Sequence, residues 1–77
     1  MKQADLIPVE NSSNVKARHY DAASKKLTVQ FKGDLVYQYA EVPPELWQQW
    51  LAADSAGSFF HAGIRQQFDC EPITLED

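Results

Sequence analysis

The fold is decided by residues 26–39, which read KLTVQFKGDLVYQY. Apolar and polar residues alternate on both sides of Gly33 and Asp34, which is the pattern of two half-buried strands joined by a hairpin turn. The length of the turn sets which side of the second strand is buried, because a slip of one residue exchanges the two faces. The sequence therefore predicts a hairpin with two alternative registers.

The two registers differ in where they place the tyrosines. A two-residue turn puts Tyr37 opposite Gln30 and turns it outward, whereas a three-residue loop puts it opposite Val29 and beneath the rest of the protein. We favour the three-residue loop because it keeps the Gln38 amide out of the core, where an unpaired amide costs about 1–3 kcal/mol. Asp34 then adopts the left-handed conformation, which Asp tolerates better than most residues. The shared inner face comprises Leu27, Val29, Phe31, Leu35, Tyr37 and Tyr39.

Outward from this hairpin, the pattern predicts one earlier strand and two later helices. The strands are expected at residues 15–20, 26–32 and 35–42, and the helices at 44–53 and 56–67. Apolar residues at helical spacing mark the inner sides of the helices. The predicted fold is α+β, a three-stranded antiparallel meander followed by two short helices packed on one face, with the other face left to water. The expected core comprises Leu27, Val29, Phe31, Leu46, Trp50, Phe60 and Ile64.

The length of 77 residues allows one domain. We expect a flexible arm at residues 1–14, the domain at 15–68 and an acidic tail at 69–77. The single cysteine, Cys70, permits no intramolecular disulfide, and no stretch approaches the ~20 apolar residues of a membrane span. With no apolar run typical of a signal peptide near the start, these features predict a cytoplasmic protein that does not bind membranes.

Charge divides the chain into two unequal halves. Residues 1–40 carry six Lys and Arg against four Asp and Glu, whereas residues 41–77 carry Arg65 alone against seven acids. The net charge of −4 is unfavourable for generic binding to nucleic acid. The acidic helical half could instead contact a basic protein partner.

No motif of catalysis or metal binding is present in the sequence. His19, His61 and Cys70 are far apart along the chain, and a zinc site needs about four ligands at characteristic spacings. We therefore expect no enzyme activity, no metal and no cofactor. His61 and Arg65 lie four residues apart in the second predicted helix, so they share one of its sides. Arg65 is expected either to hold a nearby carboxylate or carbonyl, or to bind an anion.

The most basic surface is expected on the outer face of the sheet. Simple alternation from Val15 turns Lys16, Arg18 and Tyr20 outward together with Lys32. Such a face could follow a phosphate backbone, or it could be an ordinary solvated face whose lysines protect the edge strands. The candidate nucleic-acid-binding residues are Lys16, Arg18, Tyr20, Lys32, Tyr37, Tyr39 and Arg65.

The order of short motifs along residues 11–68 resembles the KTSC domain, a family named for its occurrence at the C-terminus of some lysyl-tRNA synthetases. The shared segments are Ser12-Ser13-Asn14-Val15, Tyr20-Asp21, Leu27-x-Val29-x-Phe31, Tyr37-x-Tyr39, Val42-Pro43, Ser55-x-Gly57-Ser58-Phe59-Phe60 and Ile64-Arg65. The chain departs from the family pattern at His61, where members usually have Asn, and at the acidic segment 68–71, where members are often rich in Tyr and Arg.

The resemblance implies a small domain of unknown biochemical role with a link to RNA or tRNA. Together with the residues, it predicts a non-enzymatic binding module that associates weakly and salt-sensitively with RNA. The alternative prediction is a protein–protein interaction module that uses the acidic helical half.

Overall fold

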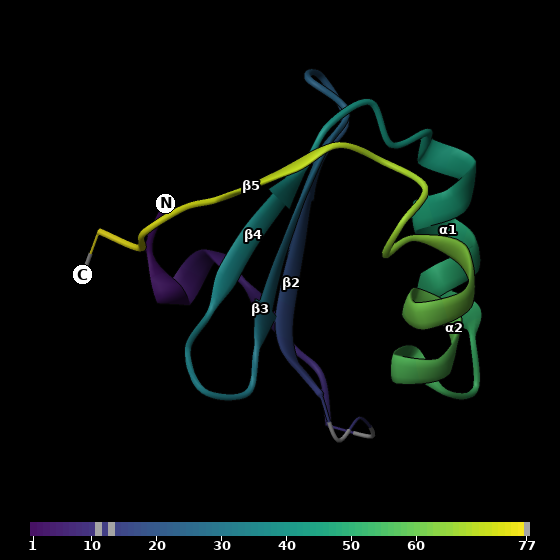
Figure 1. Ribbon diagram of the computed structural model, residues 1–77, viewed down its shortest axis with the longest axis horizontal. Helices are drawn as coiled ribbons and strands as arrows, with labels where there is room; N and C mark the ends of the chain where they lie inside the picture. Colours follow the sequence, from purple (N-terminus) through teal and green to yellow (C-terminus); the bar gives the residue numbers. More distant parts are fainter. Residues whose placement is uncertain (11, 13, 77) are drawn as a thin grey trace.

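The computed structural model describes residues 1–10, 12 and 14–76. Asn11 and Ser13 of the shared motif region, and Asp77 of the acidic tail, lie outside the described residues. The elements follow the order η1 (Gln3–Asp5), β1 (Ile7–Pro8), β2 (Val15–Asp21), β3 (Lys26–Phe31), β4 (Val36–Tyr39), α1 (Pro44–Ala52), α2 (Ala56–Gly63) and β5 (Cys70–Pro72). Both α-helices cover one face of the sheet, and both chain ends lie on the other side (Figure 1).

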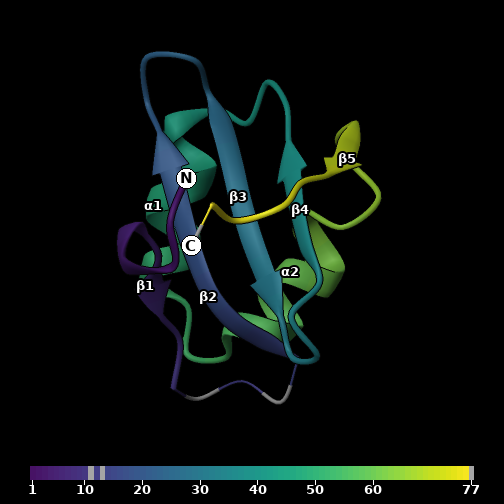
Figure 2. The ribbon, with the colours of Figure 1, turned by 90° about the vertical axis from the view of Figure 1, so that its left-hand side faces the viewer.

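The described residues form a sheet of five antiparallel strands in the order β1-β2-β3-β4-β5. The α+β class and the meander of β2, β3 and β4 are confirmed, but the prediction of three strands was wrong. Residues expected as an arm contribute β1, and residues expected as a tail contribute β5 (Figure 2). These two strands escape prediction because they span only two and three residues, too few to show alternation, and each contains a proline.

The register of the hairpin is the predicted three-residue one. Val29 lies opposite Tyr37, and the backbone N–H of Phe31 donates to the carbonyl of Leu35 at 2.8 Å. Asp34 has a φ of 66°, in the left-handed region. Leu35, however, is 59% exposed, against the expectation that it joins the inner face. It closes the loop just before β4 begins, beyond the area that the helices cover.

A β-bulge reverses the expected faces of β2. Val15 lies opposite Phe31, and Ala17 lies opposite Gln30. Two steps along β2 therefore match one step along β3, which makes Lys16 an extra residue in β2. From there the alternation runs in the opposite sense, and Arg18 lies opposite Val29 on the inner face. The prediction that Arg18 and Tyr20 point outward was wrong, because alternation counted from Val15 cannot detect an inserted residue.

The core lies between the sheet and the two helices. Of the seven expected core residues, five are buried, while Phe31 and Leu46 are half-buried and pack against them. Trp50 is fully buried on α1, and its indole Nε1 donates to the carbonyl of Ala56 at 2.9 Å, which joins the two helices. Helix α2 begins at the Ser55 cap, whose hydroxyl accepts from the backbone N–H of Ser58. It ends at residue 63 rather than at 67.

The outer face of the sheet is covered by the two ends of the chain, so the expectation of a wet face was wrong. Thr28 and Gln30 are only 1% and 2% exposed. The side-chain amides of Gln3 and Gln30 pair reciprocally at 2.6 and 2.8 Å, and the N-terminal ammonium contacts the Glu76 carboxylate. Figure 2 shows the segment after β5 crossing in front of β4 and β3. Little of this face is therefore free for a ligand.

Candidate functional site

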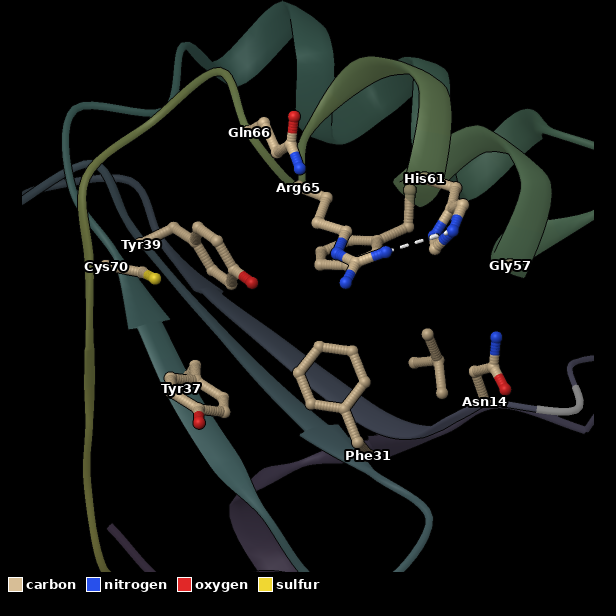
Figure 3. A pocket seen from close by; sticks show the side chains of 11 residues that line it. Asn14, Phe31, Tyr37, Tyr39, Gly57, His61, Arg65, Gln66 and Cys70 are labelled. Carbon is tan, nitrogen blue, oxygen red and sulfur yellow. Dashed lines mark hydrogen bonds between the residues drawn. The ribbon is translucent and has the colours of Figure 1, made fainter.

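A cavity of about 460 Å³ lies between α2 and the inner face of β3 and β4 (Figure 3). Its walls come from four parts of the chain: the start of β2, the β3–β4 hairpin, α2 with the turn after it, and the start of β5. The lining residues are Asn14, Val15, Phe31, Tyr37, Tyr39, Gly57, Phe60, His61, Arg65, Gln66 and Cys70. We refer to this space as the aromatic cavity.

Aromatic rings form the inner wall of the aromatic cavity. The ring of Phe31 meets those of Tyr37 and Phe60 edge to face, with centroids 6.0 and 5.4 Å apart. Tyr39 meets Phe60 in the same way at 5.6 Å. The strand residues lie together because they occupy alternate, inward positions of two paired strands. Phe60 and Tyr39 are buried, whereas Phe31 and Tyr37 are half-buried, so the latter two rings offer the apolar surface that a planar ligand could contact.

Arg65 supplies positive charge to the aromatic cavity. Its Nη1 lies 3.1 Å from Nε2 of His61, one helical turn earlier, and both side chains are exposed. Because a guanidinium can only donate, His61 is the acceptor of this hydrogen bond. Figure 3 shows the guanidinium directed toward His61, with both side chains on the α2 side of the cavity. The remaining guanidinium N–H groups can point to a bound anion.

Tyr39 brings a polar group to the opposite wall. The residue is 4% exposed, and burial, followed by the neighbouring Cys70, raises the pKa of its hydroxyl to about 12. The hydroxyl therefore keeps its proton throughout the physiological range and can donate as well as accept a hydrogen bond.

Arg18 lies against the tryptophans of α1 and not on the outer face of the sheet. Its Cζ lies 4.5 Å from the ring centroid of Trp50 and 5.6 Å from that of Trp47. Its Nε and Nη1 are buried and have no hydrogen-bond partner among the described residues, and burial lowers the pKa of the guanidinium. Tyr20 stacks on Trp47 at 5.5 Å, and its hydroxyl donates to the carbonyl of Val42. Neither side chain faces the outer surface.

The seven candidate residues from the sequence thus separate into three groups. Tyr37, Tyr39 and Arg65 come together in the aromatic cavity. Arg18 and Tyr20 pack under α1. Lys16 and Lys32 are exposed outside the cavity, where the ammonium of Lys16 contacts the Asp34 carboxylate at 3.0 Å. The structure therefore does not assemble the expected basic outer face.

Several lining residues were not among the sequence candidates, notably Asn14, Phe31 and Gln66. Phe31 was predicted to face inward, which was a usable signal. Asn14 belongs to a segment shared with the KTSC pattern, whereas Gln66 gave no signal, because it reaches the cavity only through the tertiary fold. Within the described ranges, no group of three His, Cys, Asp or Glu side chains could hold a metal ion. None of the described helices has the length and apolarity to cross a membrane.

Comparisons with known proteins identify relatives of this fold. A family model described as KTSC domain matches residues 11–68. A protein of Tsukamurella paurometabola is 41% identical over 61 residues, which make up 79% of this chain and 90% of the relative. A lysine–tRNA ligase of Nostoc sp. is 32% identical over 62 residues, 80% of this chain but only 11% of the ligase.

A solved structure agrees with these sequence relatives. The crystal structure of a KTSC domain protein from Yersinia pestis superposes with a TM-score of 0.85 at 35% sequence identity, and the match covers 90% of this chain and 96% of that chain. The family match spans most of the sheet and both α-helices, including nearly every residue that lines the aromatic cavity. The chain belongs to the KTSC domain family.

Proposed function

We propose that this KTSC domain is a non-enzymatic binding module that holds an unpaired nucleotide of an RNA in the aromatic cavity. The observation that carries the proposal is the meeting of aromatic rings with an exposed guanidinium, that of Arg65, in one cavity. Proteins recognise single-stranded RNA largely by stacking its bases on aromatic side chains, and each stacked base contributes about 1–3 kcal/mol. In this proposal the base stacks on the half-buried rings of Phe31 and Tyr37, and Arg65 contacts the phosphate of the same nucleotide.

The dimensions of the aromatic cavity suit this ligand. A volume of about 460 Å³ lies within the range of about 300–1,000 Å³ that is usual for small-ligand sites. The polar groups around the rings include the Asn14 and Gln66 amides and the Tyr39 hydroxyl. Amides and hydroxyls can both donate to and accept from base edges.

The relatives support an RNA ligand. Lysine–tRNA ligases of Nostoc sp. and Trichormus variabilis contain a segment 32% and 31% identical to this chain. Enzymes of this name act on tRNA, so a binding module within them has RNA nearby. The net charge of −4 argues that affinity is weak and falls as salt rises.

The test is a fluorescence anisotropy titration of a labelled oligouridylate at low salt. We expect Arg65→Gln to weaken binding by about 5- to 10-fold, through loss of a charged phosphate contact at an exposed site. Tyr37→Leu preserves apolar packing but removes a stacking surface, and it should weaken binding by a similar factor. Lys2→Gln removes an equal charge on the far side of the sheet and serves as the matched control.

The pattern of losses decides the outcome. Binding that Arg65→Gln and Lys2→Gln reduce equally would reflect total charge only, and wild-type protein that binds no RNA would contradict the proposal.

The second candidate is a protein-interaction module, favoured by the exposed acids Glu41, Glu45, Asp69 and Glu71. It predicts instead a nuclease-resistant complex with a basic protein, which Glu45→Gln weakens and Arg65→Gln leaves intact.

A further inference from the structure

A second hollow, of about 510 Å³, adjoins the aromatic cavity at the start of α2. Asn14, Gly57 and His61 line both spaces. The two hollows therefore adjoin between α2 and the described residues Ser12 and Asn14, and we refer to them together as the groove. His61 stands at the junction, where it accepts the hydrogen bond of Arg65.

The two ends of the groove differ in chemistry. The aromatic cavity is walled by rings, whereas the second hollow is lined by the serines Ser12, Ser55 and Ser58 together with Asn14. Ser55 accepts from the N–H of Ser58, and Ser12 accepts from the N–H groups of Asn14 and Val15. In these bonds the serine oxygens only accept, so their own hydroxyl protons can be donated elsewhere. A ligand that fills the groove needs a planar end and a hydroxyl-bearing end.

Gly57 lets Ser12 approach α2 closely at the border of the two hollows. It is the second residue of α2, where alanine would favour the helix more than glycine does. A Cβ atom at this position would lie 3.0 Å from Oγ of Ser12, tighter than an ordinary contact, and would displace the Ser12 side chain that lines the second hollow. A glycine inside an element commonly marks a close approach of another backbone or of a ligand.

We infer that the groove binds two successive nucleotides, and that the second hollow holds the ribose of the neighbour and selects RNA over DNA. This inference rests on the proposed function of the aromatic cavity. The base of the first nucleotide stacks on the rings, and the phosphate that joins the pair lies beside Arg65 and His61. The neighbouring ribose then faces the serines. A ribose 2′-hydroxyl both donates and accepts, as serine hydroxyls do, and DNA has no such group.

The experiment compares two labelled probes of one base sequence, an oligouridylate and the matching oligodeoxyuridylate, by anisotropy. Wild-type protein should bind the RNA about 3- to 10-fold more tightly, the effect of one or two hydrogen bonds. Ser58→Ala removes an exposed hydroxyl and leaves the Ser55 cap in place. It should reduce the RNA preference toward unity and leave DNA binding unchanged. Ser24→Ala, an exposed serine in the turn after β2, is the matched control.

Gly57→Ala provides a second, independent readout. Alanine favours the helix, while the tight contact of its Cβ with Ser12 opposes this gain, so the melting temperature should stay close to that of wild type. It should weaken binding of the oligouridylate while uridine monophosphate, which occupies the aromatic cavity alone, binds as before. This contrast separates an altered groove from a damaged fold.

The possible failures are distinguishable. Wild-type protein that binds neither probe overturns the proposed function and this inference with it. Wild-type protein that binds RNA and DNA equally, or a Ser58→Ala variant that retains the full RNA preference, overturns the second hollow alone. Loss of uridine monophosphate binding in Gly57→Ala would likewise contradict the division into two spaces.

Discussion

Arg18 offers the sharpest test of how this small core is held together. Its guanidinium lies over two indole rings, at 4.5 and 5.6 Å, an arrangement worth about 2 kcal/mol when desolvated. Against this, two of its nitrogen donors are buried without an acceptor among the described residues, each costing about 1–3 kcal/mol. Together the two donors cost about 2–6 kcal/mol, which equals or exceeds the favourable term. The charge itself should therefore contribute little net stability.

Two substitutions separate the charge from the packing. Arg18→Met keeps an unbranched apolar stem against the rings and removes the unpaired donors, so we expect stability within about 1 kcal/mol of wild type, or above it. Arg18→Ala leaves a gap beside Trp50 and should cost about 2–4 kcal/mol. Lys16→Met, an exposed neighbour on β2, is the control and should change stability by less than about 0.5 kcal/mol.

Urea unfolding followed by tryptophan fluorescence measures these differences, because both tryptophans contact Arg18. Equal slopes for the three variants and wild type would show that the midpoints report stability alone. The reasoning would be refuted if Arg18→Met lost as much stability as Arg18→Ala. That result would mean that the guanidinium has a polar partner which the charge requires.

Three further predictions concern stability. Trp50→Ala should cost about 3–5 kcal/mol, because a fully buried indole and its bond to Ala56 are lost, and a thermal melt close to wild type would show that α1 is peripheral. The raised pKa of Tyr39, about 12 against the usual 10, means that the folded state holds this proton more tightly than the unfolded chain does. The proton's contribution to the free energy of unfolding, on the order of 1–2 kcal/mol after allowance for the nearby open cavity, is complete below pH 10 and is lost between pH 10 and 12. In alkaline unfolding, the stability of Tyr39→Phe should therefore fall less across this window than that of wild type. An identical pH profile would contradict the assignment. Deletion of residues 73–77 should uncover Thr28 and Gln30 and speed hydrogen exchange in β3, whereas unchanged exchange would mean that the C-terminal segment protects nothing.

The sequence by itself determined the local features of this protein. Alternation across residues 26–39 was sufficient to predict the hairpin, its register and the inward tyrosines, because burial of one strand face strongly constrains pairing. Helical spacing located both α-helices, and the shared motifs identified the family. These are short-range properties, in which each residue reports on neighbours a few positions away.

Only the tertiary structure decided which surfaces are available. The extra residue Lys16 places Arg18 on the inner face of the sheet, against Trp50, and not on the outer face that was expected to bind RNA. Alternation alone cannot reveal such an insertion. The chain ends cover the outer face through contacts such as that between Gln3 and Gln30, 27 residues apart. The aromatic cavity likewise joins Asn14, Phe31, Arg65 and Cys70, which have no periodic relation in the chain. Contacts between distant segments arise when two layers pack, and no pattern within either layer encodes them.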